Sequence, residues 1–179
     1  MRKVIQSVLV SADGVVSDPG QWALDYRDAE VEKDTLHRLG DIDSMLLGRG
    51  TYQLFAATWP GQTSDFAARM NSMRKYVFSS SLDRAGWANS TLVRGDAVTE
   101  VTRLREQDGP DLVLYGHGRL AQALREHGLI DEFRFAIHPV LAGRGQLLFQ
   151  AGGKAPLILI GAETLGTGIV VLSYRPASP

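Results

Sequence analysis

The sequence predicts an α/β fold built on a single mixed, mostly parallel sheet. Short apolar segments alternate with amphipathic helical segments through the first two-thirds of the chain, a pattern typical of parallel strands joined by helices. The last apolar segments follow one another with no helical segment between them, which predicts an antiparallel C-terminal hairpin. A length of 179 residues corresponds to one domain, so we expect a single domain over residues 1–179.

In the first half of the chain, three short apolar runs bounded by turn residues predict strands. These runs cover residues 3–10, 44–47 and 75–79. Between them, apolar residues recur at the three- and four-residue spacing of a helix that has one buried face. The helices predicted in this way cover residues 28–39, 51–58 and 64–73.

The second half continues the alternation and then changes character. Asp96 is a suitable N-cap for a helix that runs to about Gln107. The remaining predicted elements are a strand over 111–115, a helix over 119–127, a strand over 132–141 and a hairpin of 156–161 with 168–175. Two glycines near the centre of that hairpin, Gly166 and Gly168, predict its turn.

Composition excludes several classes of protein. Nineteen Lys and Arg balance twenty Asp and Glu, whereas binding to nucleic acid or to an anionic membrane favours a basic excess. The absence of cysteine excludes disulfides, thiol nucleophiles and zinc fingers, and no metal-binding constellation is found. No apolar run is long enough to span a membrane. We therefore expect a cytoplasmic protein that binds neither nucleic acid nor membrane.

Three segments share one design, in which an apolar strand leads through small or cationic residues into a helix. They are LLGRGT (46–51), YVFSSS (76–81) and LYGHGR (114–119). Glycines let a backbone approach a phosphate, helix N-termini favour its charge, and arginine adds a bidentate contact. Each segment alone is more often a simple turn or loop. Because parallel strands end at one edge of a sheet, the three together predict a polyphosphate site there.

The ordinary dinucleotide-binding fingerprint is not satisfied. GHGRLA (116–121) fits the GxGxxA form, but that fingerprint also needs an acidic residue about 20 positions further on, at the end of the next strand. The next predicted strand instead ends near His138 and Pro139. We therefore reject the classical Rossmann arrangement.

Six segments together resemble the dihydrofolate reductase superfamily, and most nearly the reductase domain of the bifunctional riboflavin-biosynthesis deaminase-reductase and its stand-alone relatives. They are SADG (11–14), LGRGTY (47–52), KYVFSS (75–80), YGHGRL (115–120), GLIDE (128–132) and HPVLAGRG (138–145). The resemblance covers nearly the whole chain and implies a three-layer fold with helices on both faces of the sheet. Without cysteines or a zinc signature, only the reductase chemistry applies.

The resemblance implies NADPH bound across the carboxyl edge of the sheet. The implied cofactor-binding residues are Ala12, Asp13, Gly48, Arg49, Thr51, Ser79, Ser80, Gly116, His117, Gly118, Arg119 and Leu120. Arg49, Arg74 and Lys75 are candidate cations for the 2′-phosphate. His117 stands where many members have the second glycine of a pair, so its peptide is cis with strain or trans, and its side chain is a ligand or a tolerated loop residue.

The implied chemistry is hydride transfer to a C=N bond, which also needs a proton. Asp28 and Glu32 are the candidate donors, although acidic residues early in a helix commonly just complement its dipole. Trp22 is a candidate wall for a flat substrate or a core residue, and Trp59 is expected in the core. Arg144 is a candidate ligand for a substrate phosphate or a solvated loop residue.

Three functions remain open at this stage. The first is an NADPH-dependent reductase of a small nitrogen heterocycle, with 5-amino-6-(5-phosphoribosylamino)uracil as the substrate that the resemblance implies. The second is reduction of dihydrofolate or another pterin, and the third is a non-catalytic ligand-binding module. The resemblance also implies a homodimer, for which the C-terminal strands carry apolar residues. These are Ile158, Ile160, Val170 and Leu172.

Overall fold

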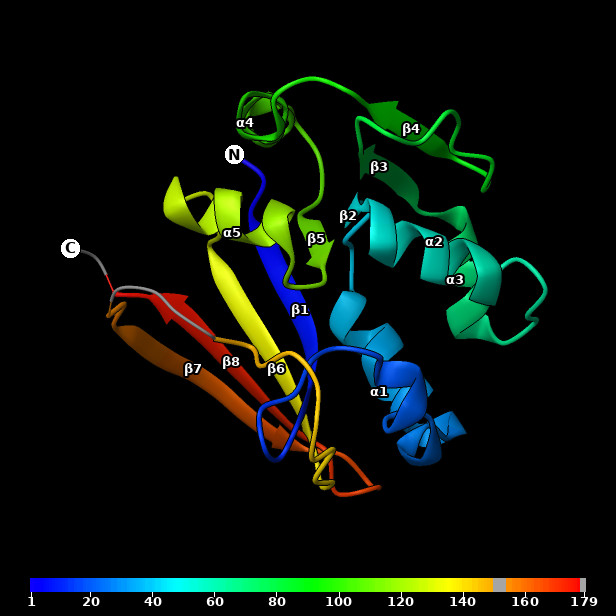
Figure 1. Cartoon of the computed structure of the whole chain (residues 1–179), viewed down its shortest axis with the longest axis vertical. Coiled ribbons are helices and arrows are strands. Elements are labelled where there is room, and N and C mark those ends of the chain that lie inside the picture. Colours follow the sequence, from blue (N-terminus) through cyan, green and yellow to red (C-terminus); the bar gives the residue numbers. More distant parts are fainter. Residues whose placement is uncertain (150–153, 178–179) are drawn as a thin grey trace.

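The computed structural model describes residues 1–149 and 154–177, which form one eight-stranded sheet and five α-helices (Figure 1). The strands are β1 (Val4–Ser11), β2 (Ser44–Gly48), β3 (Arg74–Phe78), β4 (Ser90–Val93), β5 (Leu112–Tyr115), β6 (Glu132–His138), β7 (Leu157–Thr164) and β8 (Val170–Pro176). The helices are α1 (Ala29–Leu39), α2 (Arg49–Thr58), α3 (Asp65–Ser72), α4 (Ala97–Glu106) and α5 (Arg119–Glu126). In this described part, no helix combines the length and apolarity needed to cross a membrane.

The strand order is β4-β3-β2-β5-β1-β6-β8-β7. All pairings from β4 to β6 are parallel, whereas β8 runs antiparallel to both β6 and β7. Figure 1 shows β7 and β8 as a long curved hairpin at the edge of the sheet. The structure therefore confirms the predicted mixed sheet and its C-terminal antiparallel hairpin.

Two apolar clusters on opposite faces of the sheet make three layers. Val4 and Val8 of β1 belong to a cluster that includes Leu104 of α4 and Leu124 of α5. Ile5 belongs to a second cluster, with buried residues of α2 and α3. Successive side chains of a strand point to opposite faces, so one apolar strand supplies both layers.

Most predicted elements are observed with boundaries shifted by one to three residues. Helix α2 begins at Arg49, two residues before the predicted start, because Gly48 occupies the N-cap position without a capping side chain. Strand β6 ends at His138 rather than at residue 141. Strand β4 was not predicted, because Ser90 and Thr91 give it little apolar character and it pairs only with β3.

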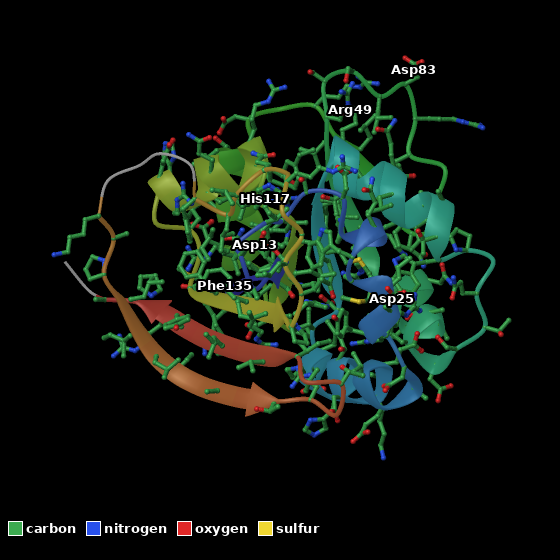
Figure 2. All side chains as sticks on the ribbon, turned by 60° about the horizontal axis from the view of Figure 1, so that its bottom comes forward. Asp13, Asp25, Arg49, Asp83, His117 and Phe135 are labelled. Atoms are coloured by element: carbon green, nitrogen blue, oxygen red, sulfur yellow. The ribbon has the colours of Figure 1, made fainter. Side chains whose placement is uncertain are left out.

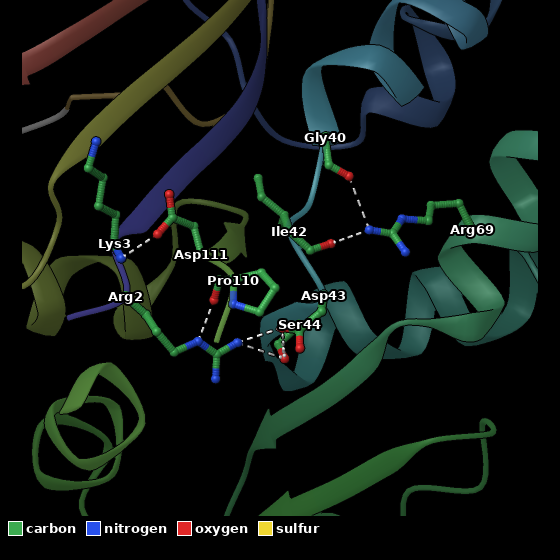
Figure 3. Close-up of polar contacts among 9 residues, drawn as sticks. All are labelled: Arg2, Lys3, Gly40, Ile42, Asp43, Ser44, Arg69, Pro110 and Asp111. Atoms are coloured by element: carbon green, nitrogen blue, oxygen red, sulfur yellow. Dashed lines mark hydrogen bonds and ion pairs between the residues drawn. The ribbon is translucent and has the colours of Figure 1, made fainter. Parts of the chain in front are cut away.

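At the amino edge of the sheet, cationic side chains join neighbouring segments (Figure 3). The guanidinium of Arg2 is buried and donates to Asp43 Oδ1 (2.5 Å), to Ser44 Oγ (3.2 Å) and to the carbonyl of Pro110. Arg69 of α3 donates to the carbonyl of Ile42 at 2.7 Å. These contacts tie the starts of β1, β2 and β5 together.

Lys75 is the most deeply buried cation of this edge. Its side chain is fully buried at the start of β3, and Nζ donates to the carbonyls of Asn71 (2.7 Å) and Met73 (2.8 Å). The same ammonium lies 4.1 Å from the centre of the Trp87 ring. Burial lowers the pKa of Lys75 to about 8.

Candidate functional site

A cavity of about 780 Å³ lies at the carboxyl edge of the sheet. The three segments that the sequence singled out all line it, together with the middle of β1 and the end of β4. Ten of the twelve predicted cofactor-binding residues are in this lining, namely Gly48, Arg49, Thr51, Ser79, Ser80, Gly116, His117, Gly118, Arg119 and Leu120. Figure 2 labels Arg49, the first residue of α2, and His117, which lies in the loop that leads into α5. The fold thus brings the three distant loops to one place.

Two helices begin at this cavity without a capping side chain. The N-caps of α2 and α5 are Gly48 and Gly118, and neither helix has an acidic residue in its first turn. By contrast, Asp28, Ser64 and Asp96 cap α1, α3 and α4, and each of those helices carries an acidic first turn. The free N–H groups and the positive dipole ends of α2 and α5 therefore remain available for an anion.

Cationic side chains around the cavity have no carboxylate partner among the described residues. Arg49 donates to Ser81 Oγ at 2.9 Å, and Arg119 is exposed. Arg94 donates to the carbonyls of Ser80 (3.2 Å) and Leu82 (2.7 Å) and so holds the serine loop in place. Sequence reasoning missed Arg94. The signal was present, because VRG (93–95) combines an arginine with a glycine, as the segments after β2 and β5 do.

Two cations predicted for a 2′-phosphate lie elsewhere. Arg74 and Lys75 are at the start of β3, whereas the cavity lies beyond the end of that strand, at Phe78 and Ser79. The amine of Lys75 is also occupied by two carbonyls. Arg74 and Lys75 therefore do not line the cavity, whereas Arg94 does.

Gly116 needs to be glycine. Its φ is +98°, and a Cβ there would lie 2.7 Å from Thr51 Oγ1. Its carbonyl accepts from Gln6 Nε2 at 2.9 Å, which fixes the loop against β1. The end of β5 consequently comes very close to the first turn of α2.

His117 is half-buried in the cavity wall. No peptide in the described ranges is cis, so the Gly116–His117 bond is trans. The Nε2 atom is buried and has no hydrogen-bond partner in the described structure. Burial lowers the pKa of His117, which favours the neutral ring at pH 7.

A second, largely apolar pocket of about 330 Å³ adjoins the cavity, between the sheet and the helices α1, α2 and α3. Phe55, Trp59 and Phe66 form aromatic walls in edge contacts, with ring centroids 6.1 and 5.2 Å apart. Six residues line both spaces, namely Ser7, Leu9, Pro19, Leu54, Phe55 and Tyr115. A ligand in the cavity and one in the pocket would therefore meet along this shared wall.

The structure separates the two candidate proton donors. Asp28 is exposed and accepts from the backbone N–H of Val31 at 2.8 Å, so it caps α1 outside the pocket. Glu32 lines the pocket and accepts from Arg27 Nε at 2.6 Å. Of the two, only Glu32 lies where it can reach a bound ligand.

Ala12 and Asp13 do not line the cavity. Asp13 accepts from Ser11 Oγ (2.5 Å) and from the N–H of Gly143 (2.7 Å), and these bonds lower the pKa of its carboxyl group (Figure 2). The backbone N–H of Ala12 donates to the carbonyl of Val140 at 2.8 Å. Both residues hold two loops together.

The structure also moves the two predicted substrate residues away from the pocket. Trp22 is buried, donates from Nε1 to the carbonyl of Ser17 at 2.9 Å, and packs edge-on against His138. Arg144 is exposed and lines neither space. Trp22 is therefore a core residue, because its ring is buried against His138 and does not line the pocket.

Sequence reasoning missed Tyr115. Its side chain lines both spaces, and its ring contacts Phe55 with centroids 5.3 Å apart. Burial raises the pKa of the phenol well above its usual range, so the hydroxyl stays protonated at neutral pH. The available signal was its place directly before Gly116 at the end of a strand.

A family model described as the RibD C-terminal domain matches residues 2–171. The chain belongs to this family. Over 180 residues it is 27% identical to the uncharacterized protein YyaP of Bacillus subtilis, covering 97% of this chain and 95% of the relative. A putative riboflavin biosynthesis protein from Shewanella sp. PV-4 has a similar structure, with a TM-score of 0.78 and 17% identity over 98% of this chain and 99% of that one.

The fold is also that of dihydrofolate reductase. The enzyme from Enterococcus faecalis, solved with NADP(H), superposes with a TM-score of 0.64 at 12% identity, covering 98% of this chain and 97% of that one. This likeness shows the fold alone. Membership of the RibD C-terminal family, by contrast, supports an oxidoreductase.

Proposed function

We propose that the protein is an NADPH-dependent reductase that transfers hydride to a small nitrogen heterocycle. The observation that carries this proposal is the pair of adjoining spaces with opposite chemistry. One has two uncapped helix N-termini and three arginines, as a dinucleotide phosphate requires. The other is apolar and aromatic, and the two meet along a shared wall that includes Ser7, Leu9 and Tyr115.

The residues of the cavity fit the cofactor. The backbone around Gly48 and Gly118 would hold its pyrophosphate, and Arg49, Ser80 and Arg94 would meet a 2′-phosphate. The buried, unpartnered Nε2 of His117 offers a further polar contact. When bound, NADPH supplies the hydride, so the protein has to orient both reactants and exclude water.

The substrate side needs a proton source and a hydrogen-bond donor. Glu32 is the carboxyl group placed to hold or relay a proton to the reduced nitrogen, and Arg27 fixes its orientation. The protonated hydroxyl of Tyr115 would donate to an acceptor atom of the substrate at the junction. Hydride addition places electron density on such an atom, so this hydrogen bond strengthens in the transition state.

Tryptophan-fluorescence titration of the purified protein with NADPH and NADH tests the proposal. NADPH should bind at least about tenfold more tightly than NADH. Arg49→Ala should remove most of that preference, because Arg49 lies beside the serine loop. Arg103→Ala, an exposed change in α4, is the matched control and should leave both affinities unchanged. Failure of a folded protein to bind either nucleotide would refute the reductase.

We also propose that two copies pair through β7. This edge strand exposes four consecutive apolar residues, Leu157, Ile158, Leu159 and Ile160, each 36–53% accessible. Val170 and Leu172 of β8 are less exposed and would add little. Sedimentation should show a dimer that Ile158→Lys dissociates, while Leu147→Lys, an exposed apolar site outside β7, should not. A wild-type species of only 19.5 kDa would contradict this pairing.

A further inference from the structure

We infer that the hydride acceptor is a flat, uncharged heterocycle without a phosphate group. This inference rests on the proposed function and concerns its apolar pocket. It departs from the phosphoribosyl substrate that the family resemblance implies. The observation behind it is that every arginine lining this pocket and the hollow beneath it is already neutralised by a carboxylate.

Arg27 is the only Lys or Arg that lines the pocket within the described ranges. Its Nε donates to Glu32 Oε1 at 2.6 Å, and its guanidinium lies 4.7 Å from the centre of the Trp59 ring. Both charged side chains are mostly buried, with 26% and 20% of their surfaces exposed. A phosphate entering here would have to compete with Glu32 for Arg27.

The hollow beneath the pocket, of about 100 Å³, repeats this arrangement. Arg38 pairs with Glu163 and Arg134 with Glu132, each at 2.6 Å. The Nη2 atom of Arg38 is buried and has no hydrogen-bond partner in the described structure, but its Nη1 atom already pairs with Glu163. The six residues outside the described ranges contain no lysine or arginine.

The neighbouring cavity shows what a phosphate site in this chain looks like. There, Arg49, Arg94 and Arg119 have no carboxylate partner in the described ranges, and two helix N-termini are open. Moving a phosphate into the apolar pocket would remove its hydration without providing comparable contacts. The cavity is therefore suited to a phosphate group, and the apolar pocket is not.

The pocket walls define the shape and polarity of the acceptor. The rings of Phe55, Trp59 and Phe66 suit a flat ring system. Glu32 accepts hydrogen bonds and Tyr115 donates one, so the ring should present both an N–H donor and a carbonyl or imine acceptor. A mono- or bicyclic nitrogen heterocycle has these properties.

Two matched pairs of probes test the inference by isothermal titration, with and without saturating NADP⁺. The pairs are 6-hydroxymethylpterin with its phosphate monoester, and uridine with its 5′-phosphate. In at least one pair the uncharged member should bind about tenfold more tightly than its phosphate ester. With saturating NADP⁺ in the cavity, equal or tighter binding of a phosphate ester in either pair, or no binding in both pairs, would overturn the inference.

A charge variant shows whether Glu32 sets this preference. Glu32→Gln leaves Arg27 without a carboxylate, so the affinity for the phosphate ester should rise about tenfold and the preference should shrink. Glu30→Gln makes the same change in the same helical turn but outside the pocket, and should have no effect. An unchanged preference in Glu32→Gln would refute the role given to the ion pair.

The two proposals can fail separately. The titration with saturating NADP⁺ reads the pocket alone, because the nucleotide occupies the cavity, and the fluorescence titration with NADPH reads the cavity alone. Loss of nucleotide binding with a retained preference for uncharged rings would refute the reductase and keep the pocket assignment. Retained nucleotide binding without a preference for uncharged rings would support the reductase and favour a phosphorylated substrate.

Discussion

The two edges of the sheet use the same kinds of side chain for different purposes. At the amino edge, Arg2, Arg69 and Lys75 direct their donors at carbonyls or carboxylates of the chain itself (Figure 3). At the carboxyl edge, Arg49 and Arg119 lie exposed beside glycine loops and uncapped helices. The amino-edge cations are structural because the chain itself supplies their partners. The carboxyl-edge arginines have few such partners, so a ligand can bind them.

The type of residue alone does not identify a binding cation. A buried cation without partners carries a large desolvation cost, so the fold supplies it with acceptors. An exposed cation has no such requirement, because water solvates its donors.

The largest effect should come from the amino edge. Arg2→Met should lower the free energy of unfolding by about 3 kcal/mol, because Asp43, Ser44 and Pro110 lose a buried partner. Urea denaturation measures this change. The dissociation constant for NADPH should stay unchanged at temperatures where the variant is folded, and a marked loss of affinity would show that the edges are coupled.

The next effect should come from the carboxyl edge. Gly118→Asp places a carboxylate at the open N-terminus of α5, where a Cβ meets no atom within 4 Å and φ is negative. It should weaken NADPH binding about 30-fold without destabilising the fold, because the new cap takes the place intended for phosphate. Gly118→Asn, which caps without charge, should weaken binding less. Unaltered affinity in both variants would remove α5 from the site.

A pH effect should distinguish Lys75 from the free arginines. Its pKa is about 8 in the folded chain and 10.5 unperturbed, so between these values the unfolded chain binds more protons. The free energy of unfolding should therefore rise with pH from about 8 to about 10.5, by about 1–2 kcal/mol relative to Lys75→Met. Urea titrations of both proteins across this range measure the difference, and parallel pH profiles would contradict the buried, proton-releasing amine.

The smallest effect should come from a capped helix. Ser64 Oγ accepts from the N–H of Ala67 at 3.2 Å at the start of α3. Ser64→Ala should cost about 1 kcal/mol of stability and leave nucleotide affinity unchanged. Thermal denaturation measures the first quantity and fluorescence titration the second. A change in affinity would mean that the capped helices also serve the ligand.

Much of the fold was predictable because the signals are local. The apolar runs of β1, β2 and β5 and the cap at Asp96 gave their elements almost directly. Strand β4 was missed, because its residues acquire strand structure only by pairing with β3. A glycine at an N-cap also hides the true start of a helix, as at Gly48.

The cavity was predictable from motifs, but the pocket was not. Strand ends, glycines and arginines recur near one another in the sequence, and parallel strands must bring them to one edge. The pocket joins residues from β1, α1, α2, α3 and β5, which share no local pattern. Sequence reasoning therefore chose Trp22 and passed over Tyr115, because aromatic character alone does not tell a wall from a core.

By itself, the sequence determined the α/β class, the order of most elements and the three phosphate-suited loops, since these depend on neighbouring residues and on strand direction. Only the tertiary structure decided which charges are satisfied. It buried Lys75 against two carbonyls, left Arg49 without a carboxylate partner in the described ranges, and put Glu32 in the pocket wall while Asp28 caps α1 outside it. Whether a charge stabilises the fold or receives a ligand depends on partners distant in sequence, and only packing assigns them.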